Sequence, residues 1–264
     1  MAELTATLAV EGEFPSASAT EEIYRWVLVE PVPAGGLWRF RRKPARSTSI
    51  HFRLVDLPGE SFAGGAHEAA SPREEVIDTL EQAKGIIFCY DPIREHDDGD
   101  TFGYLHEVLI RLSRRMLADD RLPADGWLPH YVAVCVTKFD DVRVTETAAR
   151  LNMLSVDPDD PHGVPRVRDD NAADLFERIT EISASGNGRM VPTVFNRYFH
   201  PDRVRYFVTS SIGFYLDQAR GTFDPEDFQN IVPGDQGFRI RGQVYPINVA
   251  EPFIWLIKMT QRAT

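Results

Sequence analysis

The sequence predicts an α/β fold in which a mostly parallel sheet carries helices on both faces. Three short runs indicate inner strands, at Gly85–Tyr90, Tyr131–Val136 and Arg205–Thr209. The first two runs are apolar throughout, with no polar alternation, as expected of strands covered on both faces. Helical patterns lie between these runs, and strands that alternate with helices are typical of a parallel sheet.

The first 60 residues predict three further strands separated by turns. The strands are expected at Glu22–Glu30, Gly36–Arg42 and Ser49–Asp56, with turns at Pro31–Gly35 and Lys43–Ser47. The last strand runs into Asp56-Leu57-Pro58-Gly59-Glu60, where proline and glycine predict a sharp stop.

Two helices are predicted around the first inner strand. Ser71-Pro72-Arg73-Glu74 has the capping-box pattern of a helix start, and the stripe that follows is Val76, Ile77, Leu80 and Ala83. After the strand, Asp91–Asp100 predicts an acidic loop. The next helix is long and amphipathic, and its apolar stripe consists of Leu105, Val108, Leu109, Leu112 and Met116.

The second half of the chain predicts four more helices. They are expected at Val142–Leu151, Ala172–Ile182, Met190–Phe199 and Ala250–Met259, and in the last of them Trp255 is expected to pack against the sheet. Residues Asp157–Asp170 predict a surface loop, and Gly221–Ile247 an extended segment. The whole chain, 1–264, is interpreted as a single domain, in which 221–264 form an extended segment and a C-terminal helix that packs on the core.

The composition excludes several classes of protein. The 264 residues carry a net charge of −11, which argues against general affinity for nucleic acid or anionic lipid. The sequence holds two cysteines, too few for a disulfide framework or a four-thiolate zinc site. It has no run approaching the roughly 18 apolar residues of a membrane span, and we expect a cytoplasmic protein with no nucleic-acid partner.

Polar signatures follow three of the predicted strands. They are Asp56-Leu57-Pro58-Gly59, Thr137-Lys138-Phe139-Asp140 and Thr209-Ser210-Ser211. Ligands of open α/β sheets bind at the carboxyl ends of the strands, so these segments are candidates for one binding site. Each segment alone is weak evidence, since Asp-x-Pro-Gly after a strand is more often a plain turn.

In this order the three segments resemble the motifs of the P-loop GTPases. The resemblance implies that Asp56 contacts Mg²⁺ through water and that Gly59 senses the terminal phosphate of GTP. It implies a guanine-reading motif in Thr137, Lys138 and Asp140, in which the Asp140 carboxylate accepts hydrogen bonds from the base. Ser210 and Ser211 fall where the family has a loop that contacts the base. The implied cofactors are Mg²⁺ and GTP or GDP.

The chain is similar, more narrowly, to bacterial GTPases of the double-GTPase type, which occur in conflict and signalling systems. The similarity lies in Gly12-Glu13-Phe14-Pro15, Asp56–Glu60, Asp91-Pro92 and Pro246-Ile247-Asn248-Val249 with Pro252 and Trp255-Leu256. It implies that Ser18 or Thr20 belongs to the first switch region. Glu60 occupies the place of a water-positioning residue, and an exposed charge is the alternative interpretation.

The phosphate-binding loop of that family, G-x-x-x-x-G-K-[ST], does not occur in this sequence. The four lysines follow Arg42, Ala83, Thr137 and Ile257, and none follows glycine. The expected sheet therefore lacks the family's first strand, P-loop and first helix. We expect either a fragment, with the motif encoded upstream in the same reading frame, or a naturally degenerate GTPase.

Two functions follow from these observations. The first is a GTPase-like guanine-nucleotide switch domain, inactive as a hydrolase in this chain because the phosphate-binding loop is absent. The alternative is a non-catalytic scaffold with a degenerate GTPase fold, in which Asp56 and Asp140 are structural. Both imply a protein partner, such as a second GTPase or another component of a conflict system.

Overall fold

The computed structural model describes residues 22–29, 47–54, 74–183, 186–217, 219–234 and 237–262. These residues belong to two compact units, the first of which contains a strand pair. Strand β1 (Glu22–Val29) pairs antiparallel with β2 (Ser47–Leu54), so that Glu22 lies opposite Leu54. Two of the predicted N-terminal strands are thus confirmed to within two residues, and the third, Gly36–Arg42, lies outside the described residues.

The second unit is built on a three-stranded parallel sheet. Strands β3 (Gly85–Tyr90), β4 (Tyr131–Val136) and β7 (Val204–Val208) lie in the order β3-β4-β7. Tyr90 is the register partner of Val136, which is in turn the partner of Val208, so all three strands end at one edge. The predicted set of neighbouring parallel strands is confirmed.

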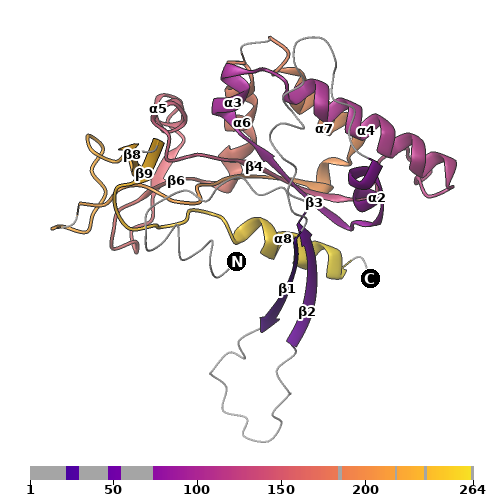
Figure 1. Cartoon of the computed structure of the whole chain (residues 1–264), viewed down its shortest axis with the longest axis horizontal. Coiled ribbons are helices and arrows are strands. Elements are labelled where there is room, and N and C mark those ends of the chain that lie inside the picture. The colour runs from indigo at the N-terminus through magenta and orange to yellow at the C-terminus, as the bar shows by residue number, and fades with distance from the viewer. Residues whose placement is uncertain are drawn as a thin grey trace, which may run out of the picture. The chain divides into compact units, whose positions relative to one another are not determined.

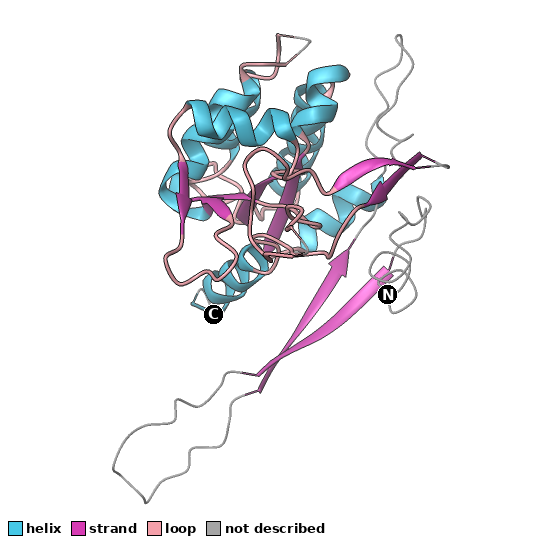
Figure 2. Cartoon of the chain, turned by 90° about the vertical axis from the view of Figure 1, so that its left-hand side faces the viewer, coloured by secondary structure: helices cyan, strands magenta, loops and turns pink. Residues whose placement is uncertain are grey.

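Helices cover both faces of this sheet (Figures 1 and 2). Side chains alternate along a strand, and β4 accordingly sends Val132, Val134 and Val136 into the larger apolar cluster. Ala133 and Cys135 point the other way and pack with Leu256 of the C-terminal helix. The single domain predicted for 1–264 stays a prediction, but the α/β architecture of this unit is confirmed.

The predicted helices all have counterparts in the structure. Their bounds are α2 Glu74–Gln82, α4 Thr101–Ala118, α5 Val142–Arg150, α6 Asp169–Thr180, α7 Met190–Tyr198 and α8 Glu251–Arg262. All five apolar residues predicted for the inner face of α4 are buried. Trp255 packs on the sheet with Tyr131 and Phe207, as predicted. None of the described helices has both the length and the apolarity needed to cross a membrane.

The predicted acidic loop Asp91–Asp100 is wrong, because its first half is a helix, α3 (Pro92–Asp97). Asp91 caps α3, accepting hydrogen bonds from the backbone N–H groups of Ile93 (3.0 Å) and Arg94 (3.2 Å). Proline at the first helical position has no N–H to satisfy and a backbone angle suited to a helix. The cap and the proline therefore outweigh the poor helix propensity of the aspartates.

The predicted loop Asp157–Asp170 is wrong at its second half. Strand β6 (Pro165–Val167) pairs antiparallel with β5 (Leu154–Val156), and α6 begins at Asp169. Val167 is buried in the large cluster and Arg166 is exposed, so burial of one face of this short strand overrides its polar surroundings. Within the predicted extended segment Gly221–Ile247, β8 (Ile231–Gly234) and β9 (Gly237–Ile240) pair antiparallel.

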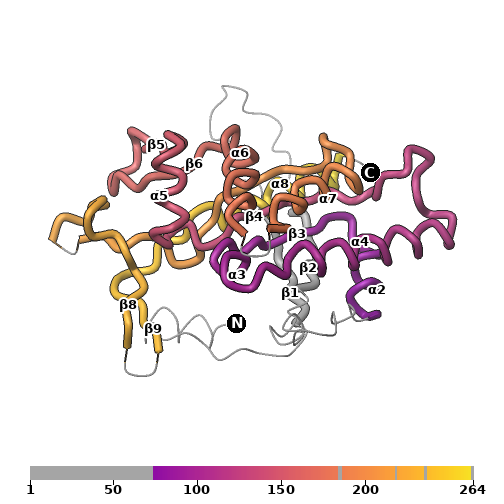
Figure 3. Tube along the Cα trace, turned by 90° about the horizontal axis from the view of Figure 1, so that it is seen from above, coloured from indigo at the N-terminus to yellow at the C-terminus, as the bar shows by residue number. Residues whose placement is uncertain are grey.

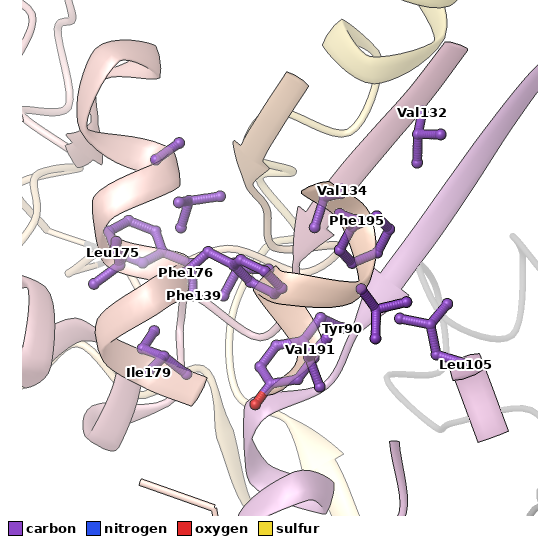
Figure 4. Close-up of a cluster of buried hydrophobic side chains, with 14 of the residues drawn as sticks. Tyr90, Leu105, Val132, Val134, Phe139, Leu175, Phe176, Ile179, Val191 and Phe195 are labelled. Carbon is purple, nitrogen blue, oxygen red and sulfur yellow. The ribbon is translucent and has the colours of Figure 1, made fainter. Parts of the chain in front are cut away.

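The core lies between the sheet and the helices α4, α6 and α7. Figure 4 shows Tyr90, Phe139, Phe176 and Phe195 gathered there with the aliphatic side chains of Leu105 and Leu175. The rings of Tyr90 and Phe176 meet edge to face, with centroids 5.2 Å apart. This packing holds the last residue of β3 rigidly at the sheet edge where the predicted site lies.

Candidate functional site

The segments that follow β4 and β7 leave the sheet side by side. The backbone N–H of Thr209 donates to the carbonyl of Val136 (2.8 Å), and the N–H of Phe139 donates to the carbonyl of Thr209 (3.0 Å). These two bonds extend the pairing of the strands beyond their last residues. The structure therefore brings two of the three predicted polar segments together, at the carboxyl edge where ligands of such sheets bind.

Asp140, after the central strand, is a buried carboxylate, with 7% of its surface exposed. The hydroxyl of Ser210 donates a hydrogen bond of 2.5 Å to Asp140 Oδ1. Burial raises the pKa of Asp140 above its ordinary value, and the Ser210 hydrogen bond opposes that rise only in part. A carboxylate fixed in this way is a directed hydrogen-bond acceptor at the end of the central strand.

Ser210 is itself held from two sides. Its hydroxyl accepts a hydrogen bond from the backbone N–H of Gly213 (2.7 Å), which closes the turn after β7. Its backbone exchanges hydrogen bonds with Ile247, 3.0 Å and 2.8 Å long. Asn248 adds a bond from its side chain to the carbonyl of Val208 (3.2 Å). The segment Pro246–Val249, singled out in the sequence, thus supports the base of the site.

The side chain of Lys138 extends toward Asp91, at the carboxyl end of the neighbouring strand β3. Its ammonium Nζ lies 2.7 Å from Asp91 Oδ2, and about half of its side chain is exposed. Its backbone has φ = 56°, a left-handed conformation that is uncommon outside glycine. Thr137 also bonds to β3, through its hydroxyl and the carbonyl of Tyr90 (3.0 Å). Both residues connect the edge of β4 to the edge of β3.

Asp91 is a residue of this edge to which the sequence analysis assigned no side-chain role. One of its oxygens caps α3 and the other pairs with Lys138. The signal available in the sequence was Asp-Pro directly after a strand, since aspartate is a preferred N-cap and proline a preferred first helical residue. The pairing with Lys138 had no sequence signal, because it depends on the neighbouring positions of β3 and β4.

Asp141, next to Asp140, has the opposite electrostatic environment. It caps α5 by accepting the N–H of Arg143 (2.9 Å) and pairs with the guanidinium of that residue (3.0 Å). Burial favours a higher pKa, but the side-chain and backbone hydrogen bonds from Arg143 outweigh it, so the pKa of Asp141 is lowered. Of the two carboxylates, Asp140 belongs to the site and Asp141 to the helix.

The remaining predicted site residues divide into two groups. Ser211 is exposed, while Ser210 makes the contact to Asp140. The others, Ser18, Thr20, Asp56, Gly59 and Glu60, lie outside the described residues, and their roles stay predictions. The same holds for Mg²⁺, whose one assigned residue is Asp56. In the described part of the chain, no three His, Cys, Asp or Glu residues are grouped so that they could hold a metal ion.

Comparisons with protein-family models, with curated proteins and with solved structures give no match in any of the three. The function of this chain is therefore inferred from the geometry of the strand ends.

Proposed function

We propose that this chain is a GTPase-like guanine-nucleotide switch domain in which Asp140 accepts hydrogen bonds from the guanine base. The sheet β3-β4-β7 is, in this proposal, the part of a P-loop GTPase fold that binds the base. The observation that carries the proposal is the buried Asp140 carboxylate, fixed by Ser210 at the carboxyl end of the central strand.

A carboxylate at this place discriminates between the purines. Guanine presents two parallel donors, its N1–H and its exocyclic amine, and an ionised carboxylate accepts both. Adenine presents an acceptor at N1, so its binding gives Asp140 no donor from the base and places two acceptors against each other. Because Asp140 is largely desolvated, a mismatched base costs more here than at an exposed aspartate.

Lys138 supports the same proposal through its position in the motif. Its aliphatic stem is expected to lie along the base and ribose, while its ammonium stays paired with Asp91. The pair at 2.7 Å holds the long side chain in one conformation, which lowers the entropy lost when a base packs on it. Asp91 is then a positioning residue for Lys138.

The phosphates have no comparable recognition in this sequence. Triphosphate binding in the family depends on a backbone cradle and its lysine, and none of the four lysines here follows glycine. We therefore propose weak, base-directed binding of GTP and GDP, with no hydrolysis by this chain alone.

A second candidate, a non-catalytic scaffold that binds a protein partner, is favoured by one observation. The hydrogen bonds of Ser210 to Asp140 and Gly213 close the turn without any ligand. In that interpretation, Asp140 stabilises the loop after β7 and reads no base.

Thermal unfolding with GTP, GDP, ATP and ADP, each with Mg²⁺, distinguishes the two functions. A ligand that binds only the folded state raises the melting temperature by mass action, so the switch domain should respond to guanine nucleotides alone. Asp140→Asn should abolish that response, because the amide places a donor against the guanine donors while keeping an oxygen for Ser210. The matched control is Asp202→Asn, an exposed aspartate before β7, at the opposite end of the sheet. Equal shifts from adenine nucleotides, or no shift at all, would overturn the switch function.

A further inference from the structure

A cavity of about 600 Å³ lies between α3, α5 and α6, separate from the Asp140 cluster. Helix α6 contacts both α3 and α5 (Figure 3). Ile93, Val144 and Ile179 contribute apolar walls, one from each helix, and Leu151 and Ile182 line it from exposed positions. A concave, mostly apolar space of this volume has the size of small-molecule sites in proteins.

The cavity contains one buried polar group without a partner. Tyr90 is 1% exposed and lines the cavity, and within the described part of the chain its hydroxyl has no hydrogen-bond partner. Its ring is fixed against Phe176, and Figure 4 shows the hydroxyl oxygen at the edge of the apolar cluster. Buried hydroxyl groups nearly always have partners, so this orphaned donor indicates a partner from outside the described residues, and a bound ligand can supply it.

The walls around Tyr90 are held by hydrogen bonds that do not involve it. The buried carboxylate of Glu95 accepts the Ser183 hydroxyl (2.5 Å) and the backbone N–H of Thr101 (3.1 Å). His96 Nδ1 lies 3.2 Å from the carbonyl of Ile182. These contacts tie α3 to the chain after α6, so this side of the cavity is already formed in the absence of a ligand.

The three arginines that line the cavity are each paired with a carboxylate. Arg143 pairs with Asp141, Arg150 with Glu146, and Arg178 with Glu181, at N–O distances of 3.0, 3.3 and 3.6 Å. An anionic ligand would have to displace one of these carboxylates, and a cationic ligand would have to displace an arginine or the hydrogen bonds that Glu95 accepts from Ser183 and Thr101. An uncharged ligand requires no such exchange.

We propose that this cavity binds an uncharged, mostly apolar small molecule whose hydrogen-bond acceptor pairs with the Tyr90 hydroxyl. The apolar helix walls provide the contact area, and the single donor orients the ligand. Burial and the nearby carboxylates of Glu95 and Asp91 raise the pKa of Tyr90, which keeps the hydroxyl protonated and able to donate. This site is independent of nucleotide binding by Asp140.

The test uses acetophenone, an uncharged aromatic ketone, as the probe, with benzoate and benzylammonium as charged molecules of similar size. Binding to the full chain is measured by saturation-transfer NMR and titration calorimetry. We expect acetophenone to bind and the two ions to bind at least tenfold more weakly. Tyr90→Phe, which removes only the hydroxyl oxygen, should weaken acetophenone binding about fivefold, the effect of one neutral hydrogen bond.

Two further variants make the test specific. Thr147→Trp places a large side chain on the α5 wall and should abolish binding. Tyr206→Phe, at a partly buried tyrosine outside the cavity, should leave binding unchanged. Undetectable binding of acetophenone, equal affinity for Tyr90→Phe, or tighter binding of either ion would overturn the proposal. Circular dichroism melts of the variants establish that any loss is not caused by unfolding.

Discussion

Two buried hydroxyl groups, at the carboxyl ends of β7 and β3, differ in how they are satisfied. Ser210 and Tyr90 are each 1% exposed, and their strands lie on either side of β4. The Ser210 hydroxyl donates to Asp140 and accepts from Gly213, whereas the Tyr90 hydroxyl has no partner in the described part of the chain.

This difference separates a region whose hydrogen bonds are complete within the described residues from a region where one hydroxyl lacks a partner there. The hydrogen bonds around Ser210 stabilise the folded state by themselves, so a base that meets Asp140 adds to an existing arrangement. Among the described residues no partner replaces the water that the Tyr90 hydroxyl loses on burial, and this destabilises the folded state until a ligand binds. Substitutions in the two regions should therefore change the free energy of unfolding by different amounts and in opposite directions.

The largest change in the free energy of unfolding is expected from Gly213→Ala, in the turn that holds Ser210. Gly213 has φ = 71°, and a Cβ atom there would lie 1.9 Å from the carbonyl oxygen of Tyr245. A left-handed alanine and a clash with backbone should together reduce the free energy of unfolding by about 3 kcal/mol or more. Urea denaturation measures the change.

Gly126→Ala is the matched control for that substitution. Gly126 has a similar φ of 78°, but a Cβ there meets nothing within 4 Å. Only the backbone conformation is penalised, so the expected loss is about 1 kcal/mol. Equal losses for the two variants would mean that the turn at Gly213 adjusts freely and does not hold Ser210 in place.

Ser210→Ala is expected to have the next largest effect. It leaves Asp140 Oδ1 and the N–H of Gly213 without their partner in a buried place, which should cost about 1–3 kcal/mol of unfolding free energy. Ser211→Ala, at the exposed neighbour, should change stability by less than about 0.5 kcal/mol. A neutral Ser210→Ala would show that water replaces the hydroxyl and that the site is more open than the structure indicates.

Tyr90→Phe should have a smaller effect of the opposite sign. The substitution removes the orphaned hydroxyl and retains the ring that packs on Phe176, so unfolding free energy should rise by up to about 1 kcal/mol. Thermal and urea unfolding of the ligand-free chain measure it. A loss of stability would mean that the hydroxyl already has a partner, and the comparison with Ser210 would no longer hold.

The elements that were predictable from sequence are those in which local pattern and burial agree. The bounds of β3 and β4 match the prediction, as does the whole inner stripe of α4, because apolar periodicity determines both. Burial was less predictable. β4 is central and nearly all buried, whereas β3, equally apolar in sequence, has Tyr90 as its one buried residue because no described strand pairs with its other edge.

The candidate site was predictable as far as chain topology determines it. Three parallel strands place Thr137–Asp140 and Thr209–Ser211 at one edge, and the structure confirms that juxtaposition. Two details depend on side-chain directions that no sequence pattern encodes. They are the choice of Ser210 over Ser211 as the partner of Asp140 and the pairing of Lys138 with Asp91. The cavity at Tyr90 was not predictable at all, since it depends on how far α3 and α5 stand apart on α6.

The smallest expected change is in the pH dependence of stability, and it comes from the adjacent carboxylates Asp140 and Asp141. Their pKa values shift in opposite directions. Burial raises the pKa of Asp140, so between the ordinary value of 3.8 and the raised value the folded state binds more protons than the unfolded state. Stability contributed by Asp140 therefore falls as pH rises through that window. Hydrogen bonds from Arg143 lower the pKa of Asp141 despite partial burial, so its contribution rises with pH in a window below 3.8.

Urea denaturation at successive pH values from about 3 to 7 measures both contributions to the free energy of unfolding. Asp140→Asn should remove the fall in stability with pH, and Asp141→Asn should remove the rise at the acid end. Differences from the unsubstituted chain cancel the titration of the groups that are not coupled to the substituted carboxylate. Parallel curves for Asp140→Asn and the unsubstituted chain would mean that this carboxylate is solvated in solution, and the case for a fixed acceptor at the end of β4 would fail.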